Sequence, residues 1–143
     1  MDPAVLKAII EQHIPFNRFL GVQATLIERS RVRLELPFRD ELIGDWMRLA
    51  LHGGVISMLA DTAGGMAVWS SLDNPATRVS TIDLRVDYLR PGKPERLIAE
   101  GTVARVGKSV GVGDVRLFHP DAEDHLIATG KGVYAIKAVK HRE

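Results

Sequence analysis

The residues that could carry chemistry lie close together in one stretch of this 143-residue chain, LHGGVISMLADTAGG, at positions 51 to 65. His52 is followed by Gly53 and Gly54, and Asp61 stands in the middle of an apolar run. Glycines at the start of a helix expose backbone N–H groups at the positive end of the helix dipole, which suits an anion or a developing oxyanion. An acid in apolar surroundings must have a partner, border a cavity or carry a raised pKa. Asp61 is therefore a candidate acid or base.

A structural role explains either feature taken alone. Asp61 would then hydrogen-bond a neighbouring strand and hold the core together, and the HGG sequence would be an ordinary glycine-rich entry to a helix. Gly64 and Gly65 each cost about 1 kcal/mol relative to Ala in a helix. They clear side chains from the helix surface three and four residues after Asp61. Another helix or a ligand is expected to pack there.

The spacing of the two candidate groups limits how they can act together. Gly53 and Asp61 are eight residues apart, or about 12 Å along a helix axis. An oxyanion donor and a catalytic acid or base must both reach one reacting centre, so one helix cannot supply both. If they act on one carbonyl, the second group comes from another copy of the chain through antiparallel packing of two such helices. The catalytic interpretation therefore predicts a homodimer with two equivalent sites.

The rest of the pattern predicts the elements that hold these residues. Apolar spacing indicates a short amphipathic helix over residues 3–13, stopped by Pro15, and a long helix over 53–71 that is apolar on every face. Alternation predicts a strand at 31–36 with a weaker one before it, and four later strands at 79–90, 96–106, 110–119 and 126–137. Gly130 and Gly132 would let the last strand approach the long helix closely. The expected fold is α+β, with a strongly curved antiparallel sheet wrapped around one helix.

Composition excludes several classes of protein. The chain has 45% apolar residues and a net charge of +1, which favours a single domain over residues 1–143 and gives no electrostatic reason to expect nucleic acid or a membrane surface as partner. It contains no cysteine, so disulfides and thiolate chemistry are excluded, and the five histidines show no metal-binding spacing. The N-terminus does not look like a signal peptide and no apolar run is long enough to span a bilayer, so we expect a cytoplasmic location.

Together these motifs resemble the hotdog-fold acyl-CoA thioesterases, in the branch of the phenylacetate-pathway and hydroxybenzoyl-CoA thioesterases. The similarity extends over nearly the whole chain, through FNRFLGVQ, LHGGVISMLADTA, STIDLRVDYLRPG, AEGTVARVGKSVGVGDVRL and LIATGKGVYAI. HGG with an acid eight residues after its first glycine, followed by a strand ending in YLRPG, is a fairly specific combination. The resemblance implies a hotdog fold, dimers that pair sheets edge to edge and often associate into tetramers, and hydrolysis of acyl-CoA without a cofactor, since coenzyme A is part of the substrate.

The resemblance also implies roles for individual residues. The Gly53 N–H would polarise the thioester carbonyl, His52 would help to shape that helix entry, and Gly54 would contact the substrate. Asp61 of the partner subunit would act as general base on water or as nucleophile. A hydroxyl early in the following strand often orients the water or the acid. Matching the motif selects Thr81, whereas strand alternation places Ser80 on the core face; we prefer Thr81.

Substrate contacts can be assigned in the same way. Many relatives carry Asn or Gln seven residues before the first helix glycine, where this chain has Trp46. Trp46 would instead line the acyl pocket and favour an aromatic or medium-chain acyl group. Coenzyme A needs cations for its phosphates, and the sequence offers Arg90 and Lys93 in one turn. A second turn, which in the family often borders the nucleotide, supplies Arg105, Val106, Gly107, Lys108 and Ser109.

Two other functions stay open at this point. One is a different hotdog enzyme, such as an acyl-thioester dehydratase or a thioesterase acting on acyl carrier protein. A dehydratase normally needs a His and an acid poised on one substrate, and His52 at a helix entry does not obviously supply that base. The other is a non-catalytic dimer that binds acyl-CoA, in which Asp61 is structural.

Overall fold

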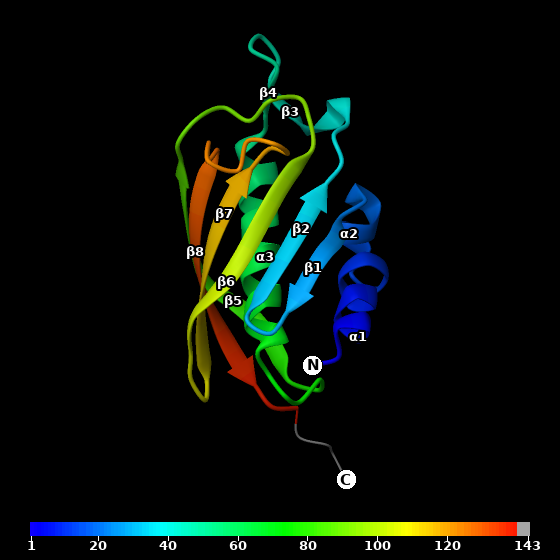
Figure 1. Cartoon of the computed structure of the whole chain (residues 1–143), viewed down its shortest axis with the longest axis vertical. Coiled ribbons are helices and arrows are strands. Elements are labelled where there is room, and N and C mark those ends of the chain that lie inside the picture. Colours follow the sequence, from blue (N-terminus) through cyan, green and yellow to red (C-terminus); the bar gives the residue numbers. More distant parts are fainter. Residues whose placement is uncertain (140–143) are drawn as a thin grey trace.

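The computed structural model describes residues 1–139 and shows a six-stranded antiparallel sheet curved around one long helix, α3 (Gly53–Ser70) (Figure 1). The strand order is β1-β2-β6-β7-β8-β5, so β1 and β5 are the edge strands. The bounds are β1 Gln23–Glu28, β2 Arg31–Leu36, β5 Arg78–Tyr88, β6 Leu97–Val106, β7 Val110–Phe118 and β8 Ala128–Lys137. This is the wrapped helix and curved sheet of the hotdog fold, so the predicted fold class is confirmed.

Helix α3 is buried because the sheet covers it closely. A Cβ atom on Gly101 of β6 would lie 2.3 Å from the Ala63 carbonyl oxygen, so only glycine permits this approach. Gly130 and Gly132 of β8 were also predicted to allow a close approach of their strand to α3, but they act differently. A Cβ on Gly130 would make only an ordinary contact, whereas a Cβ on Gly132 would lie 2.2 Å from the Tyr134 hydroxyl oxygen. Gly132 therefore makes room for the Tyr134 ring. In residues 1–139 no helix has both the length and the apolar character needed to cross a membrane.

The predicted helix over 3–13 is confirmed: α1 (Pro3–Ala8) continues directly into the π-helical η1 (Ile9–His13). A further short helix that was not predicted, α2 (Pro15–Leu20), follows it. Pro15 does not simply end a helix, since it is the first residue of the next one, a position where the missing N–H costs nothing. Leu6 and Ile10 are fully buried, and these segments cover one side of the core.

A small hairpin that the sequence did not indicate precedes α3. A 3-10 turn, η2 (Asp40–Leu42), leads into β3 (Ile43–Asp45), which pairs with β4 (Ala50–Leu51). The Asp45 carboxylate accepts hydrogen bonds from the backbone N–H groups of Met47 and Arg48 at 3.1 and 3.0 Å and thus closes the tip. The hairpin projects beyond the end of the sheet (Figure 1).

Glu100 is a buried carboxylate on β6 that two arginines of β2 neutralise. Arg33 Nε donates to its Oε2 at 2.9 Å and Arg31 Nη2 at 3.2 Å, and the residue is 6% exposed. Burial by itself would raise the pKa of Glu100, but the hydrogen bonds from Arg33 and Arg31 outweigh it and hold the pKa below its usual value. The carboxylate therefore stabilises the fold in its charged form.

Replacing Glu100 by Gln is expected to lower the free energy of unfolding by about 1–3 kcal/mol at neutral pH, because two guanidinium groups lose a charged acceptor. The folded pKa lies below the unfolded one, so this stabilisation is complete above the unfolded carboxyl pKa and is lost as the pH falls through the folded pKa. The difference between the two proteins in urea titrations should therefore begin to shrink below about pH 4.3, the unfolded carboxyl pKa, and should vanish only below the lower folded pKa of Glu100. An equal difference between them at acid and neutral pH would contradict this account.

Candidate active site

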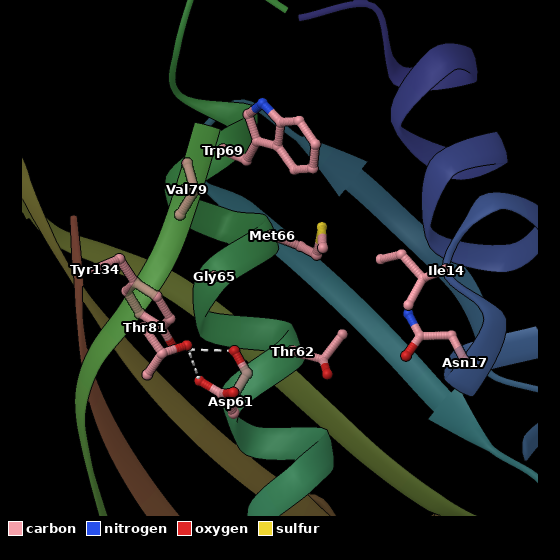
Figure 2. Close-up of a pocket in the computed structure, with 10 residues that line it drawn as sticks. All are labelled: Ile14, Asn17, Asp61, Thr62, Gly65, Met66, Trp69, Val79, Thr81 and Tyr134. Carbon is pink, nitrogen blue, oxygen red and sulfur yellow. Dashed lines mark hydrogen bonds between the residues drawn. The ribbon is translucent and has the colours of Figure 1, made fainter. Parts of the chain in front are cut away.

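Asp61 lies half-buried on α3 and contacts two strands (Figure 2). Thr81 of β5 donates a hydrogen bond from Oγ1 to Asp61 Oδ1 at 2.8 Å. The Tyr134 hydroxyl of β8 donates to the Asp61 backbone carbonyl at 2.9 Å. Burial, and after it the Asp61 charge, raises the pKa of Tyr134, so its phenol stays protonated and remains a donor. These contacts fix Asp61 while one side of its carboxylate borders a cavity.

The two helix glycines next to Asp61 make space for a strand residue. A Cβ on Gly64 would lie 2.4 Å from the Tyr134 hydroxyl oxygen, and a Cβ on Gly65 would lie 3.1 Å from its ring. Tyr134 of β8, a strand residue rather than the expected helix or ligand, fills most of the space beside these two glycines. Gly65 also borders the cavity.

A β-bulge decides which hydroxyl of β5 faces Asp61. The register pairs Ser80 with Ala135 and Thr81 with Tyr134, and it shifts between Thr81 and Asp83. Thr81 therefore shares the helix-facing side with Tyr134, and Ser80 faces away. Ile82, the extra residue, is 59% exposed. Counting alternation back from the end of the strand selects Ser80 because that count does not include the bulge.

A Thr81→Val variant, which keeps the shape of the side chain, is expected to lower kcat by about tenfold or more. It removes a hydrogen bond to a charged carboxylate, and such a bond contributes about 1.5–3 kcal/mol. Ser80→Ala is the matched control, and its activity should stay within about twofold of wild type. Steady-state kinetics on the same substrate compare the two. Equal losses in both variants would show that the Thr81 hydroxyl has no special role.

The amino end of α3 forms a second group of candidate residues. His52 is the N-cap, and its Nδ1 accepts a hydrogen bond from the Gly54 N–H at 2.8 Å. The Gly54 N–H predicted to face substrate is therefore already used in the cap. The Gly53 N–H donates to no acceptor within residues 1–139. Of the two glycines, Gly53 is thus the available donor at the positive end of the helix.

Tyr88, at the end of β5, covers this helix entry and was not singled out from the sequence. Its hydroxyl donates to the Gly53 carbonyl at 3.0 Å and is hydrogen-bonded to the Ser57 hydroxyl. A hollow of about 400 Å³ lies beside it, with Gly53, Tyr88, Arg48 and Arg90 among its lining residues. The YLRPG motif contains both Tyr88 and Arg90, so the pattern was a signal for this part of the site.

A second missed residue, His119, fixes the loop beside the hollow. It is 5% exposed, accepts the Lys93 N–H at Nε2 (2.8 Å) and donates from Nδ1 to the Arg96 carbonyl (2.7 Å). In the same loop, the Gly92 carbonyl accepts a hydrogen bond from the Leu51 N–H at 2.9 Å. Leu51 lies just before the start of α3. His119 thereby holds the loop that carries Lys93 against the helix entry.

The predicted coenzyme A contacts lie at opposite ends of the sheet. Arg90 and Lys93 belong to the connection before β6, and Arg90 contacts His125 at 3.0 Å. Arg105 and Val106 end β6, and Gly107, Lys108 and Ser109 form the turn into β7. Because β6 has ten residues, the two groups are about 30 Å apart. One chain does not bring these cations together.

Trp46 lies at the tip of the β3–β4 hairpin and is 76% exposed. It lines neither the cavity beside Asp61 nor the hollow beside Gly53. Within one chain Trp46 therefore borders neither of these spaces, and its place in an acyl pocket stays a prediction. Met47 at the same tip is 75% exposed, so the projecting hairpin presents two large apolar side chains.

The candidate residues of one chain therefore form two half-sites. Asp61 and Thr81 border one cavity, while Gly53, Tyr88 and Arg90 line the other hollow. Eight residues of α3 separate the two groups, or about 12 Å along the axis. The edge strand β5 carries a residue of each group, Thr81 in the first and Tyr88 in the second. Within residues 1–139 no cluster of three His, Asp or Glu side chains could hold a metal ion.

Comparisons with known proteins identify the family of this chain. Residues 50–124 match the family model described as thioesterase superfamily. The chain is 37% identical to the medium/long-chain acyl-CoA thioesterase YigI of Escherichia coli, over 87% of this chain and 86% of that protein.

Solved structures show the same architecture. A Shewanella oneidensis protein related to the thioesterase superfamily superposes with a TM-score of 0.84 at 30% identity, covering 94% of each chain. A thioesterase family protein from Silicibacter pomeroyi reaches a TM-score of 0.85 at 23% identity, over 95% of this chain and 98% of that one, and supports the fold.

Proposed function

Because the chain belongs to the thioesterase superfamily, we propose that it hydrolyses acyl-CoA thioesters to a free acid and coenzyme A at two sites shared between the subunits of a homodimer. The observation that carries the proposal is the free Gly53 N–H at the amino end of α3, together with a carboxylate on the same helix too distant to join it. The relationship to a named acyl-CoA thioesterase supports the substrate class.

In the proposed site, Gly53 of one subunit meets Asp61 of the partner subunit. Antiparallel pairing of two β5 edges would place the amino end of one α3 beside the middle of the other. Such pairing would also cover Ile82, which is 59% exposed on this edge. A second copy on that edge would form hydrogen bonds with its unpaired backbone N–H and C=O groups. An exposed strand edge otherwise promotes aggregation.

The chemistry follows from these positions. The Gly53 N–H and the helix dipole stabilise negative charge that develops on the thioester oxygen. In one route, Asp61 takes a proton from water as the water oxygen bonds to the carbonyl carbon. The C–S bond then breaks, and the thiolate of coenzyme A takes that proton. In the other, the Asp61 carboxylate attacks the carbonyl carbon and the C–S bond breaks, which releases the thiolate of coenzyme A. Water then cleaves the resulting anhydride to the free acid and Asp61, and the thiolate takes a proton from that water. Thr81 orients the carboxylate in both.

Binding of coenzyme A also fits a dimer. Antiparallel pairing brings opposite ends of two sheets together, so Arg90 and Lys93 of one subunit would approach the second turn, with Arg105 and Lys108, of the other. The nucleotide phosphates need several cations. Within a single chain, these four residues form two pairs at opposite ends of the sheet. The hollow lined by Gly53, Tyr88 and Arg90 would receive the thioester end of the coenzyme A arm.

The other two functions make different use of the same residues. A dehydratase needs a free His base, but the His52 ring accepts the Gly54 N–H as a helix cap. A binding dimer would need no available donor at Gly53. A substrate on acyl carrier protein would present the same thioester. Comparing the turnover of acyl carrier protein thioesters with that of acyl-CoAs distinguishes these two substrate classes.

Release of free thiol from a panel of acyl-CoAs and acyl carrier protein thioesters tests the proposal. We expect turnover of acyl-CoA and a native mass of two or four chains. Binding without turnover on every substrate would support the non-catalytic dimer instead. A native mass of one chain under assay conditions would overturn the shared site.

A further inference from the structure

The cavity beside Asp61 extends along one face of α3. Its lining includes Asp61, Thr62, Gly65, Met66 and Trp69, which follow each other at helical spacing. Figure 2 shows Asp61 at one end of this row and the Trp69 ring at the other, with Met66 between them. The cavity therefore starts at the proposed reacting carboxylate and ends at a tryptophan.

The polarity of the wall changes along this path. Thr81 and Thr62 lie near Asp61, whereas the far end has Met66 and Trp69, with Val79 beside Trp69. Asn17 and Ile14 form the wall across the cavity from α3. Thr62 Oγ1 donates to the Met58 carbonyl at 2.9 Å, and the Asn17 side-chain amide donates to the Ile10 carbonyl at 3.1 Å. These polar groups have partners within the protein. A ligand with a polar head and an alkyl tail matches the cavity.

The volume of the cavity and its length along α3 give the same estimate for the number of carbons in that tail. A 150 Å³ apolar cavity holds one benzene, about 25 Å³ per carbon, so the cavity of about 250 Å³ has room for about ten carbons. Asp61 and Trp69 are eight residues apart, or about 12 Å along the axis. An extended chain advances about 1.2 Å per bond, so about ten bonds span the distance.

We propose that this cavity binds the acyl chain and that Trp69 closes its far end, which limits a straight acyl group to about ten carbons. The inference rests on the proposed thioesterase function, because the thioester must lie at Asp61. Trp69 is then a specificity-determining residue. Exposed Trp46, which was predicted from the sequence to line the acyl pocket, has no part in this limit.

The test measures kcat/KM for straight-chain substrates from butanoyl-CoA to hexadecanoyl-CoA. In the wild type, we expect kcat/KM to rise by up to about fourfold per added methylene, to peak near decanoyl-CoA, and to fall for longer chains. Trp69→Leu should move the peak toward dodecanoyl- and tetradecanoyl-CoA. Met66→Trp, which fills the middle of the cavity, should move it toward hexanoyl- and octanoyl-CoA. Loss of stability alone would lower all substrates together and leave the peak in place.

Binding to the Asp61→Asn variant gives a second readout without turnover. Calorimetric affinity for the same substrates should rise with chain length and stop rising near decanoyl-CoA, and Trp69→Leu in that background should extend the rise. An unmoved peak in Trp69→Leu, or a peak moved by Trp46→Ala instead, would overturn this inference and leave the thioesterase function standing. Absence of turnover on every acyl-CoA would overturn both.

Discussion

An Asp61→Asn variant is expected to lose kcat by about 10²–10⁴-fold, the range that a general base contributes, with KM little changed. The Asn side-chain oxygen can still accept the Thr81 hydrogen bond that Asp61 Oδ1 accepts at 2.8 Å. The variant therefore removes the charge and the proton acceptor while it keeps the shape. Steady-state release of thiol from a good acyl-CoA substrate measures the loss.

Two controls make this result specific to chemistry. The urea midpoint of Asp61→Asn should stay close to that of wild type, because the substitution keeps the backbone carbonyl of residue 61 that accepts the Tyr134 hydrogen bond. Its affinity for acyl-CoA should also persist. Full turnover by the Asn variant would remove Asp61 from its role and leave the carboxylate as a structural partner of Thr81.

The second large effect is expected from Gly53→Pro, which deletes the oxyanion donor. Gly53 is the first helical residue, a position where proline is favoured. His52 before it has φ −61° and ψ 132°, the extended conformation that a following proline requires. A Cβ at this position would lie 3.5 Å from the Tyr88 ring, an ordinary contact. The helix should therefore form, and kcat should fall by about 10²–10³-fold.

Gly54→Ala is the nearest comparison in the chain, because its N–H is already bound to the His52 ring. Its Cβ would lie 2.9 Å from His52 Nδ1, so that ring must shift to admit it. It keeps the Gly53 N–H, so its loss of activity should be smaller than that of Gly53→Pro. Unchanged turnover in Gly53→Pro would show that the thioester oxygen is held elsewhere.

Mixing the two inactive variants tests whether the site is shared. In a dimer that pairs an Asp61→Asn chain with a Gly53→Pro chain, one of the two sites contains both an intact Gly53 and an intact Asp61. Random pairing of equal amounts should restore about a quarter of wild-type activity. Co-expression with two different tags allows the mixed dimer to be isolated. A mixed dimer as inactive as its parents would place each site within a single chain.

Much of the fold was predictable from the sequence because local patterns and burial agree. The four predicted later strands match β5, β6, β7 and β8 to within two residues at each end, and the predicted long helix ends one residue from the end of α3. Alternation and helical periodicity predict such elements directly. The N-terminal segments were less predictable, because Pro15 is compatible with either the end or the start of a helix.

The sequence by itself determined the candidate chemistry and the separation of its parts. Gly53, Asp61 and the eight residues between them specify a donor and an acid that one rigid helix holds about 12 Å apart. Only the tertiary structure decided the surroundings of these groups. A bulge in β5 turns Thr81 rather than Ser80 toward Asp61, and the His52 ring uses the Gly54 N–H but leaves that of Gly53 free. The first depends on strand register, which arises when distant segments pair. The second depends on the orientation of the His52 ring two residues away, which no apolar periodicity encodes.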